Sequence, residues 1–276
     1  MKSVAQCKKE YKVAIVILNY LNYKDTIECV NSALQQTYKI EKIIIVDNGS
    51  DNCSMIRLKR HYKENAKVKV IALKNNVGFA RGNNVGIDYA RKKTKVDFVL
   101  VVNNDTKFID NEYLDKLIKA YEPGVGIIGS QILLPSGYVQ DRCSCMLNMR
   151  ECMLDYLNKF SFQRGGSFDF QINSSDRVEV LHGCALLFTP AFFKYYRGFY
   201  PKTFLYHEEE ILYLMCRCKS LRQKYVVTTT IFHKEDQSSK LSFSNDFIIK
   251  EKYQYQSYKY VLLWILKCRL LRKEIA

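Results

Sequence analysis

Val13-Ala-Ile-Val-Ile-Leu18 is a continuous run of apolar, β-forming residues. Such a run, without polar alternation, is typical of a strand buried on both faces of a parallel sheet. Residues 24–36 follow with apolar side chains at helical spacing, and Ile43-Ile-Ile-Val46 is a second buried strand. Strand, helix and strand in this order predict a βαβ unit.

The same alternation continues along the chain and predicts a doubly wound α/β sheet with helices on both faces. Further strands are expected at residues 68–73, 97–102, 178–181, 185–188 and 225–231, and further helices at residues 79–93, 111–121 and 208–219. Beyond Gly124 the alternation weakens, and residues 131–176 are predicted to be irregular. One continuous domain is expected.

Charge limits the classes of partner. The 276 residues carry 43 Lys and Arg against 28 Asp and Glu, a net charge of +15. Anionic lipids, phosphorylated small molecules and nucleic acid all fit this charge. Near the C-terminus, however, basic residues lie among apolar and aromatic ones, from Lys252 to Lys273. This pattern favours a membrane surface and argues against a nucleic-acid partner.

The apolar run Tyr260–Leu266 is too short to span a bilayer, which needs about 20 residues. Two alternatives remain for this tail: a helix lying in the headgroup region, or a helix packed on the domain.

Ten Cys are present, yet residues 1–12 are polar and basic, without the apolar core of a signal peptide. Reduced thiols and a cytoplasmic location, peripheral at the inner face of the membrane, are therefore expected. The pairs Cys143/Cys145 and Cys216/Cys218 lack the usual zinc or redox spacing, so they are interpreted as small packed residues.

Polar clusters follow the predicted strands. In open α/β sheets ligands bind outside the carboxyl ends of the strands. There the sequence has Asn19-Tyr20, Asp47-Asn48-Gly49-Ser50, the loop 75–84 with Asn76, Gly78, Arg81 and Asn83, and Asn103-Asn104-Asp105. A carboxylate and amides suit a nucleotide, and a Gly-rich loop with an Arg allows close approach of a diphosphate. Each cluster alone could equally be a turn or a helix cap.

Several acidic and histidine side chains are candidates for metal binding or catalysis. Asp105 is a hard oxygen ligand suited to Mn²⁺ or Mg²⁺. Glu208-Glu209-Glu210 begins a predicted helix, where acidic residues complement the helix dipole. Adjacent carboxylates can also raise the pKa of one of them and so create a general base. His182 and His233 both follow or border strands and are candidates of lower specificity.

In this order the segments resemble family 2 glycosyltransferases of the GT-A fold, particularly the bacterial rhamnosyltransferase-like members. The resemblance covers residues 11–236 and rests on Val16-Ile-Leu-Asn-Tyr20, Ile45-Val-Asp-Asn-Gly-Ser50, Asn76–Asn84 and Asn103-Asn-Asp105. It implies a Rossmann-like, mainly parallel central sheet flanked by helices, with a C-terminal helical extension. It also implies a nucleotide-sugar donor and a saccharide or lipid-linked acceptor.

The resemblance assigns a role to each candidate. The donor is expected to contact Asn19, Tyr20, Asp47, Asn48, Asn76, Gly78, Arg81, Asn83, Asn103 and Asn104. Asp105 and His233 are expected to hold Mn²⁺ or Mg²⁺, although Asn103 replaces the first Asp of the family's D-x-D motif. Glu209, beside Glu208, is the expected base for inverting transfer, and His182, Gly183 and Cys184 would border the acceptor.

The expected organisation is a glycosyltransferase domain over residues 1–240 and an amphipathic helical tail over residues 241–276. Residues from about 11 to 123 are expected to form its nucleotide-binding half, and residues from about 124 to 240 its acceptor half. Two alternatives stay open. A nucleotidyltransferase could use the same sheet and carboxylate, and a non-catalytic anion- or membrane-binding protein could use the same charge.

Overall fold

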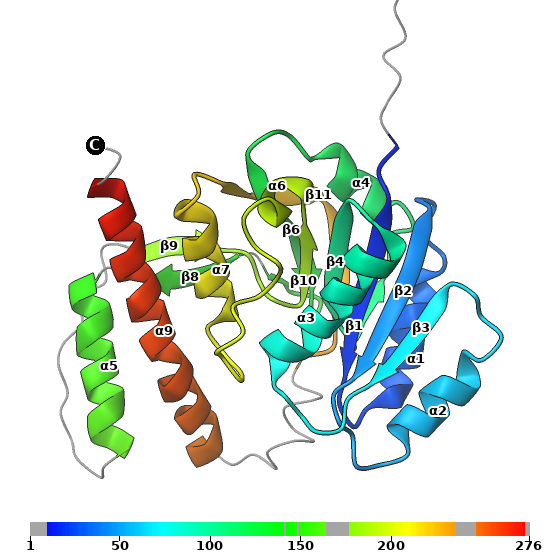
Figure 1. Ribbon diagram of the computed structural model, residues 1–276, viewed down its shortest axis with the longest axis horizontal. Helices are drawn as coiled ribbons and strands as arrows, with labels where there is room; N and C mark the ends of the chain where they lie inside the picture. The colour runs from blue at the N-terminus through cyan, green and yellow to red at the C-terminus, as the bar shows by residue number, and fades with distance from the viewer. Residues whose placement is uncertain (1–9, 141, 148, 164–176, 236–246, 274–276) are drawn as a thin grey trace, which may run out of the picture.

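A nine-stranded mixed sheet runs through the centre of the protein, in the order β3-β2-β1-β4-β10-β6-β11-β5, with β7 paired to β6 (Figure 1). The computed structural model describes residues 10–140, 142–147, 149–163, 177–235 and 247–273. The strands are β1 (Val13–Asn19), β2 (Ile40–Asp47), β3 (Val68–Ala72), β4 (Phe98–Asn103), β5 (Thr106–Phe108), β6 (Val125–Leu133), β7 (Val139–Gln140), β10 (Ala185–Phe188) and β11 (Arg222–His233). A separate ribbon pairs β8 (Cys143–Met146) with β9 (Arg177–Val180).

Helices cover both faces of the sheet, as predicted. They are α1 (Tyr23–Ala33), α2 (Ser54–His61), α3 (Phe79–Tyr89) continued by the π-turn η1 (Ala90–Thr94), α4 (Tyr113–Lys119), α5 (Met149–Gln163), α6 (Pro190–Phe193), α7 (Glu208–Arg217) and α9 (Phe247–Lys273). Buried side chains of α1, α2 and α4 form one core cluster with the sheet. Those of α3, α6, α7 and α9 form the other.

The first half of the sheet confirms the prediction. β1 pairs in parallel with both β2 and β4, and every residue from Val13 to Ile17 is fully buried. The apolar run therefore forms a central strand because both of its faces are covered. β10 runs antiparallel between β4 and β6, so the second half of the sheet is mixed.

The prediction that residues 131–176 are irregular is wrong for much of the segment. β6 extends to Leu133, and β7, β8 and α5 follow, while residues 164–176 lie outside the described part of the chain. α5 packs against α9, where the Tyr156 and Tyr255 rings stack at 5.0 Å between centroids. Because α5 is supported by a helix about a hundred residues later in the chain, its own apolar pattern gives little sign of it.

The C-terminal tail forms a helix that packs on the domain with one face, as the second of the two alternatives predicted. α9 contributes Tyr258, Val261 and Ile265 to the core cluster that includes α7. A disulfide joins Cys218, at the end of α7, to Cys268 of α9, so the prediction of reduced thiols is wrong for this pair. The fold brings together two cysteines separated by 50 residues, which no local spacing could indicate. Among the described helices, none has the length and apolar character of a membrane span.

Candidate active site

The carboxyl ends of β1 and β2 are joined by a polar network. Asn19 and Asp47 are partners in the parallel register, and both are buried. The Asp47 carboxylate accepts hydrogen bonds from Asn19 Nδ2 at 2.7 Å and from Ser50 Oγ at 2.8 Å. Asn19 Oδ1 in turn accepts from Thr26 Oγ1 at 2.7 Å. The network fixes both strand ends, and Tyr20 follows it half-buried.

A second network holds the loop before α3. Asn48 Nδ2 donates to Asn76 Oδ1 at 2.9 Å, and Asn48 Oδ1 accepts from the Val77 amide at 3.0 Å. Gly78 has φ +87°, and a Cβ there would lie 2.5 Å from the Phe204 carbonyl oxygen. The loop therefore needs glycine for both its backbone conformation and its close approach to the segment before α7.

The two polar side chains predicted from α3 lie in different environments. Arg81 is exposed and donates from Nε to the Pro201 carbonyl at 2.7 Å. Asn83 is buried and donates to the Phe79 carbonyl at 3.1 Å, while its Oδ1 has no protein partner. Neither placement tests the predicted donor contacts, which remain predictions.

Asn103, Asn104 and Asp105 end β4 and turn into β5. Asn103 lies at the sheet edge beside Leu18 of β1. Asn104 is buried and donates to the Asn22 carbonyl at 3.1 Å and to Thr26 Oγ1 at 3.2 Å. It therefore braces the β4–β5 turn against the start of α1.

Asp105 and His233 form a buried pair. β11 ends beside β5, with His233 opposite Thr106, and this pairing brings the imidazole to the turn. His233 Nε2 lies 3.3 Å from Asp105 Oδ1, and His233 Nδ1 has no protein partner. The His182 ring lies 5.7 Å from that of His233. Burial, and then the charge of His233, lower the pKa of His182 to about 4, so it is neutral near pH 7.

This pair fits a divalent cation only together with other ligands. Two neighbouring ligands of an octahedral ion, each about 2.1 Å from it, lie about 3.0 Å apart, close to the observed separation. Within the described residues, no group of three His, Cys, Asp or Glu side chains could hold a metal ion. Sites of one carboxylate and few protein ligands are completed by water and substrate phosphates. Asp105 and His233 match such a site.

The acidic run begins α7 after a strained turn. Tyr206 and His207 both have positive φ, 72° and 67°, which turns the chain sharply into the helix. The Gly183 amide donates to Glu209 Oε1 at 3.1 Å, and a Cβ at Gly183 would lie 2.4 Å from that oxygen. The β9–β10 loop therefore fits closely against the Glu209 carboxyl group.

The three carboxyl groups have different proton affinities. Burial would raise the pKa of Glu210, but the hydrogen bond and charge of His207, 3.0 Å away, outweigh it and lower that pKa. Burial and the negative charge of Glu210 raise the pKa of Glu209 to about 7. Burial and then Glu209 raise the pKa of Glu208 well above its usual value, and Glu208 Oε1 has no protein partner. Glu209 is therefore the carboxyl group that titrates near neutral pH.

A pocket of about 320 Å³ brings the acidic run and the sheet edge together. It is lined by Phe79, Asn103, Cys143, Cys145, His182, Gly183, Cys184, Leu205, Tyr206, His207, Glu208, Glu209, Glu210 and Gln254. Asn103, Glu208, Glu209 and all three predicted acceptor residues thus share one pocket. The other predicted donor and metal residues do not line it.

Eight lining residues were not among the predicted site residues: Phe79, Cys143, Cys145, Leu205, Tyr206, His207, Glu210 and Gln254. His207 immediately precedes the acidic run, and this position in the sequence could have indicated that it lies at the site. Cys143 and Cys145 of β8 are half-buried with free thiols, and burial raises the pKa of Cys143 to about 12. Gln254 comes from α9, and no local pattern indicated it.

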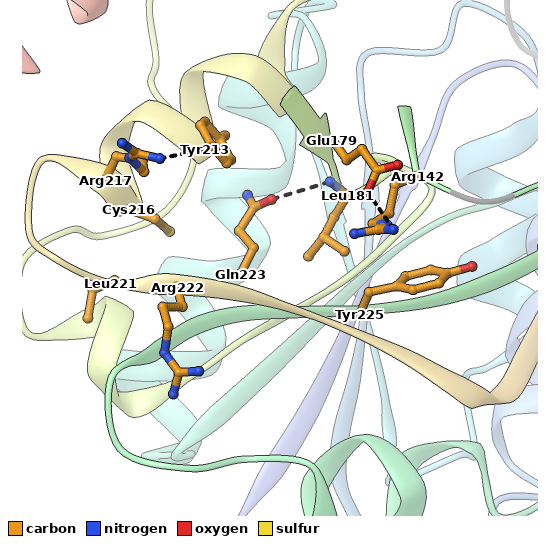
Figure 2. A pocket seen from close by; sticks show the side chains of 10 residues that line it. All are labelled: Arg142, Glu179, Leu181, Tyr213, Cys216, Arg217, Leu221, Arg222, Gln223 and Tyr225. Carbon is orange, nitrogen blue, oxygen red and sulfur yellow. Dashed lines mark hydrogen bonds and ion pairs between the residues drawn. The ribbon is translucent and has the colours of Figure 1, made fainter. Parts of the chain in front are cut away.

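A second pocket, of about 280 Å³, lies beyond Leu181 (Figure 2). It is lined by Arg142, Glu179, Leu181, Tyr213, Cys216, Arg217, Leu221, Arg222, Gln223 and Tyr225. Arg142 pairs with Glu179 above the Tyr225 ring, and Arg217 donates to the Tyr213 hydroxyl at 3.0 Å. The predicted site residues all lie in the described part of the chain, and none of them lines this pocket.

Comparison with known proteins identifies the family. A model of the family described as glycosyl transferase family 2 matches residues 13–156. Glycosyltransferase GlyG of Streptococcus pneumoniae is 31% identical over 93 residues, 34% of this chain and 30% of that protein. Hyaluronan synthase of Streptococcus pyogenes is 33% identical over 117 residues, 41% of this chain and 27% of the synthase. The matched part thus spans less than a third of these relatives.

Solved structures share the fold. A structure of GalNAc-T7 with UDP, GalNAc and Mn²⁺ has a TM-score of 0.61 at 12% identity, over 84% of this chain and 45% of that one. Mannosyltransferase PcManGT from Pyrobaculum calidifontis, in complex with GDP-Man and Mn²⁺, has a TM-score of 0.58 at 11% identity, over 95% and 74% of the two chains. The mixed sheet with helices on both faces is therefore the GT-A fold. Because the family model matches more than half of this chain, the chain belongs to glycosyl transferase family 2.

Proposed function

We propose that the chain transfers a sugar from a nucleotide-diphosphate sugar, UDP- or dTDP-linked, to a saccharide or lipid-linked saccharide, with inversion at the anomeric carbon. One observation carries the proposal. Glu209, whose pKa is raised to about 7, lines the same pocket as Asn103 at the carboxyl end of β4. A base near its optimal pKa thus lies beside the edge of the sheet where α/β proteins bind their ligands.

The donor would occupy the edge made by β1, β2 and β4. At this edge the Asn19 side chain donates to Asp47, and the Asn48 backbone amide donates to the Asn19 carbonyl at 2.8 Å, so the three residues would offer a preorganised rim for the base and ribose. Tyr20, Asn76, Gly78, Arg81, Asn83, Asn103 and Asn104 complete the proposed donor set. Because hydrogen bonds fix most of this rim, little rearrangement would be needed on binding.

Asp105 and His233 would hold a divalent cation, which would offset the negative charge that develops on the departing diphosphate. The 3.3 Å separation of His233 Nε2 and Asp105 Oδ1 supports this role. Imidazole is a poor ligand for the hard Mg²⁺ ion, so the pair favours Mn²⁺.

Glu209 would remove the proton of the acceptor hydroxyl as that oxygen attacks the anomeric carbon. The new carbon–oxygen bond forms as the bond to the diphosphate oxygen breaks, so a single displacement inverts the centre. The proton ends on Glu209, and the bonding electrons leave with the diphosphate. Glu210, ionised beside His207, helps to keep the Glu209 pKa high enough to accept a proton. Glu208 would remain protonated beside it.

The acceptor would lie against His182, Gly183 and Cys184, which line the pocket next to Glu209. The relatives named hyaluronan synthase and the O-antigen biosynthesis protein RfbC of Myxococcus xanthus, 30% identical over 113 residues, support a role in polysaccharide synthesis. A lipid-linked acceptor would place the enzyme at a membrane surface, with its basic C-terminal segment as the contact.

A panel of nucleotide sugars tests the proposal. Each donor is titrated into the protein with Mn²⁺, and slow donor hydrolysis is followed by nucleotide release, with EDTA as the control. Saturable, Mn²⁺-dependent binding of one UDP- or dTDP-sugar is expected. No binding across the panel would contradict it and favour a non-catalytic protein. Pyrophosphate release from a nucleoside triphosphate and a sugar phosphate would favour a nucleotidyltransferase.

A further inference from the structure

The C-terminal helix α9 has an apolar face that packs on the protein and a second apolar stripe that does not. Its inner face buries Tyr258, Val261 and Leu262 in the core, and α9 lies beside α5 at the edge of the molecule away from β1–β3 (Figure 1). A helix packed in this way normally shows a polar outer face.

The outer face of α9 carries exposed leucines. Leu263, Leu266 and Leu270 are 53%, 47% and 64% exposed. Side chains three and four residues apart lie on the same face of a helix, so these leucines form one continuous stripe. The stripe exposes apolar side chains that neither the core cluster of α7 nor the packing of α5 covers.

Basic side chains surround the leucine stripe. The exposed residues of α9 from 252 to 270 are Lys252, Gln256, Lys259, Leu263, Leu266, Lys267, Arg269 and Leu270. No acidic side chain is exposed in this stretch. Lys267 Nζ lies 4.4 Å from the centre of the Trp264 ring. Leucines flanked by long basic side chains are the composition of a helix that lies in the plane of a lipid headgroup layer.

We propose that the leucine stripe and its basic flank, Lys259, Lys267 and Arg269, form a docking face for a membrane with anionic headgroups. A second copy of the chain is disfavoured as occupant, because a symmetric contact would bring the same basic groups together. Anionic headgroups complement that charge, and the acyl boundary accepts the leucines.

The inner face of the same helix contacts the pocket segment. Ser257 Oγ donates to the Leu205 carbonyl at 2.8 Å, the Tyr258 ring lies 4.9 Å from that of His207, and Gln254 lines the pocket. The docking face is thus separated from the pocket by roughly one helix diameter, about 10 Å. Delivery of a lipid-linked acceptor to Glu209 by this face rests on the proposed function, whereas lipid binding itself does not.

Vesicle co-sedimentation tests the docking face. Wild-type protein is mixed with vesicles of phosphatidylcholine alone or with added phosphatidylglycerol, at low and high salt. We expect binding to the anionic vesicles that high salt weakens. The combined change Leu263→Ser, Leu266→Ser and Leu270→Ser should weaken it about tenfold or more, as should Lys259→Gln, Lys267→Gln and Arg269→Gln together.

Matched controls change exposed residues elsewhere. Ile56→Ser with Val227→Ser, both 62% exposed in wild type, and Lys59→Gln with Arg60→Gln and Lys63→Gln should bind vesicles as wild type does. Circular dichroism verifies the fold of each variant. Equal binding of the stripe variant and wild type, or no preference for anionic vesicles, would overturn the proposal. The proposal would also be overturned if wild-type protein formed a dimer, the leucine-to-serine changes dissociated that dimer, and wild-type protein did not bind vesicles.

The two proposals fail separately. Vesicle binding is measured without a donor, so protein that binds vesicles but no nucleotide sugar would retain the docking face and lose the proposed function. Protein that transfers sugar to a water-soluble acceptor but does not bind vesicles would retain the proposed function and lose the docking face. If both proposals hold, the stripe variant should keep its rate on a soluble acceptor and lose about tenfold on a vesicle-embedded one.

Discussion

The Gly183 amide donates a hydrogen bond of 3.1 Å to Glu209 Oε1, and this bond joins the β9–β10 loop to the first turn of α7. It holds the proposed base by a backbone group, whose position is fixed by the sheet through β10. The approach is so close that only a glycine leaves room for the carboxyl group at its present position.

Gly183→Ala should reduce turnover by about tenfold or more without unfolding the protein. The new Cβ would lie 2.4 Å from Glu209 Oε1, so the carboxyl group must move. The Gly183 backbone is not in the left-handed region, which limits the effect to this contact. Steady-state kinetics with a soluble acceptor measure the loss. Adding Glu209→Asp to Gly183→Ala should cost less activity than Glu209→Asp costs in the wild-type protein, because the shorter side chain leaves room for the new methyl group. If the losses of the two single variants simply added in the double variant, the contact would be contradicted.

Activity should rise with pH through about 7. Glu209 accepts a proton only when ionised, and burial with the charge of Glu210 raises its pKa to about 7. Below that pH the protonated form predominates, and kcat/KM should fall about tenfold for each pH unit. A profile from pH 5 to 9 measures this limb. A rate that stays constant down to pH 5 would exclude Glu209 as the base.

Stability should show the opposite dependence. A carboxyl group whose pKa rises from 4.5 to about 7 on folding stabilises the folded state while protonated, fully below pH 4.5, and this contribution is lost as the pH rises through 7. Glu209→Gln removes the ionisation, so at pH 8 it should raise the free energy of unfolding relative to wild type by on the order of 3 kcal/mol. Urea unfolding at pH 5 and pH 8 measures the difference. An equal effect at both pH values would contradict the burial of this carboxyl group.

Asp105→Asn should weaken Mn²⁺ binding about tenfold or more, because it removes the charged member of the proposed pair. His233→Ala should have the same direction of effect, and Mn²⁺ should support transfer better than Mg²⁺. Titration of Mn²⁺ in the presence of UDP or dTDP, followed by electron paramagnetic resonance, measures the affinity. Asp88→Asn, a change on the outer side of α3, is the control. Unchanged affinity in both variants would move the metal elsewhere.

The central strands could be predicted closely from the sequence. β1 and β4 have apolar runs because sheet and helices cover both of their faces, and their ends differ from prediction by about one residue. α5 and the Cys218–Cys268 disulfide could not be predicted, since both depend on where α9 lies. Local patterns record burial but not the identity of a distant partner.

The site divides in the same way. Asn103 and Glu209 were predicted as separate strand-end and helix-start residues, and the fold brings them to one pocket. The different pKa values of Glu208, Glu209 and Glu210 could not be predicted from the sequence. They depend on the contact of His207 with Glu210, which lowers the pKa of Glu210, and on the depth at which each carboxyl group is buried.

The most direct measurement compares donor binding and transfer in Glu209→Gln. The amide keeps the shape of the side chain and cannot accept the acceptor's proton. Calorimetry should find donor affinity within about twofold of wild type, while kcat falls by about a hundredfold or more, as expected for loss of a general base. Transfer at the wild-type rate with intact donor binding would contradict the account, because the base of this glycosyltransferase would then be another group.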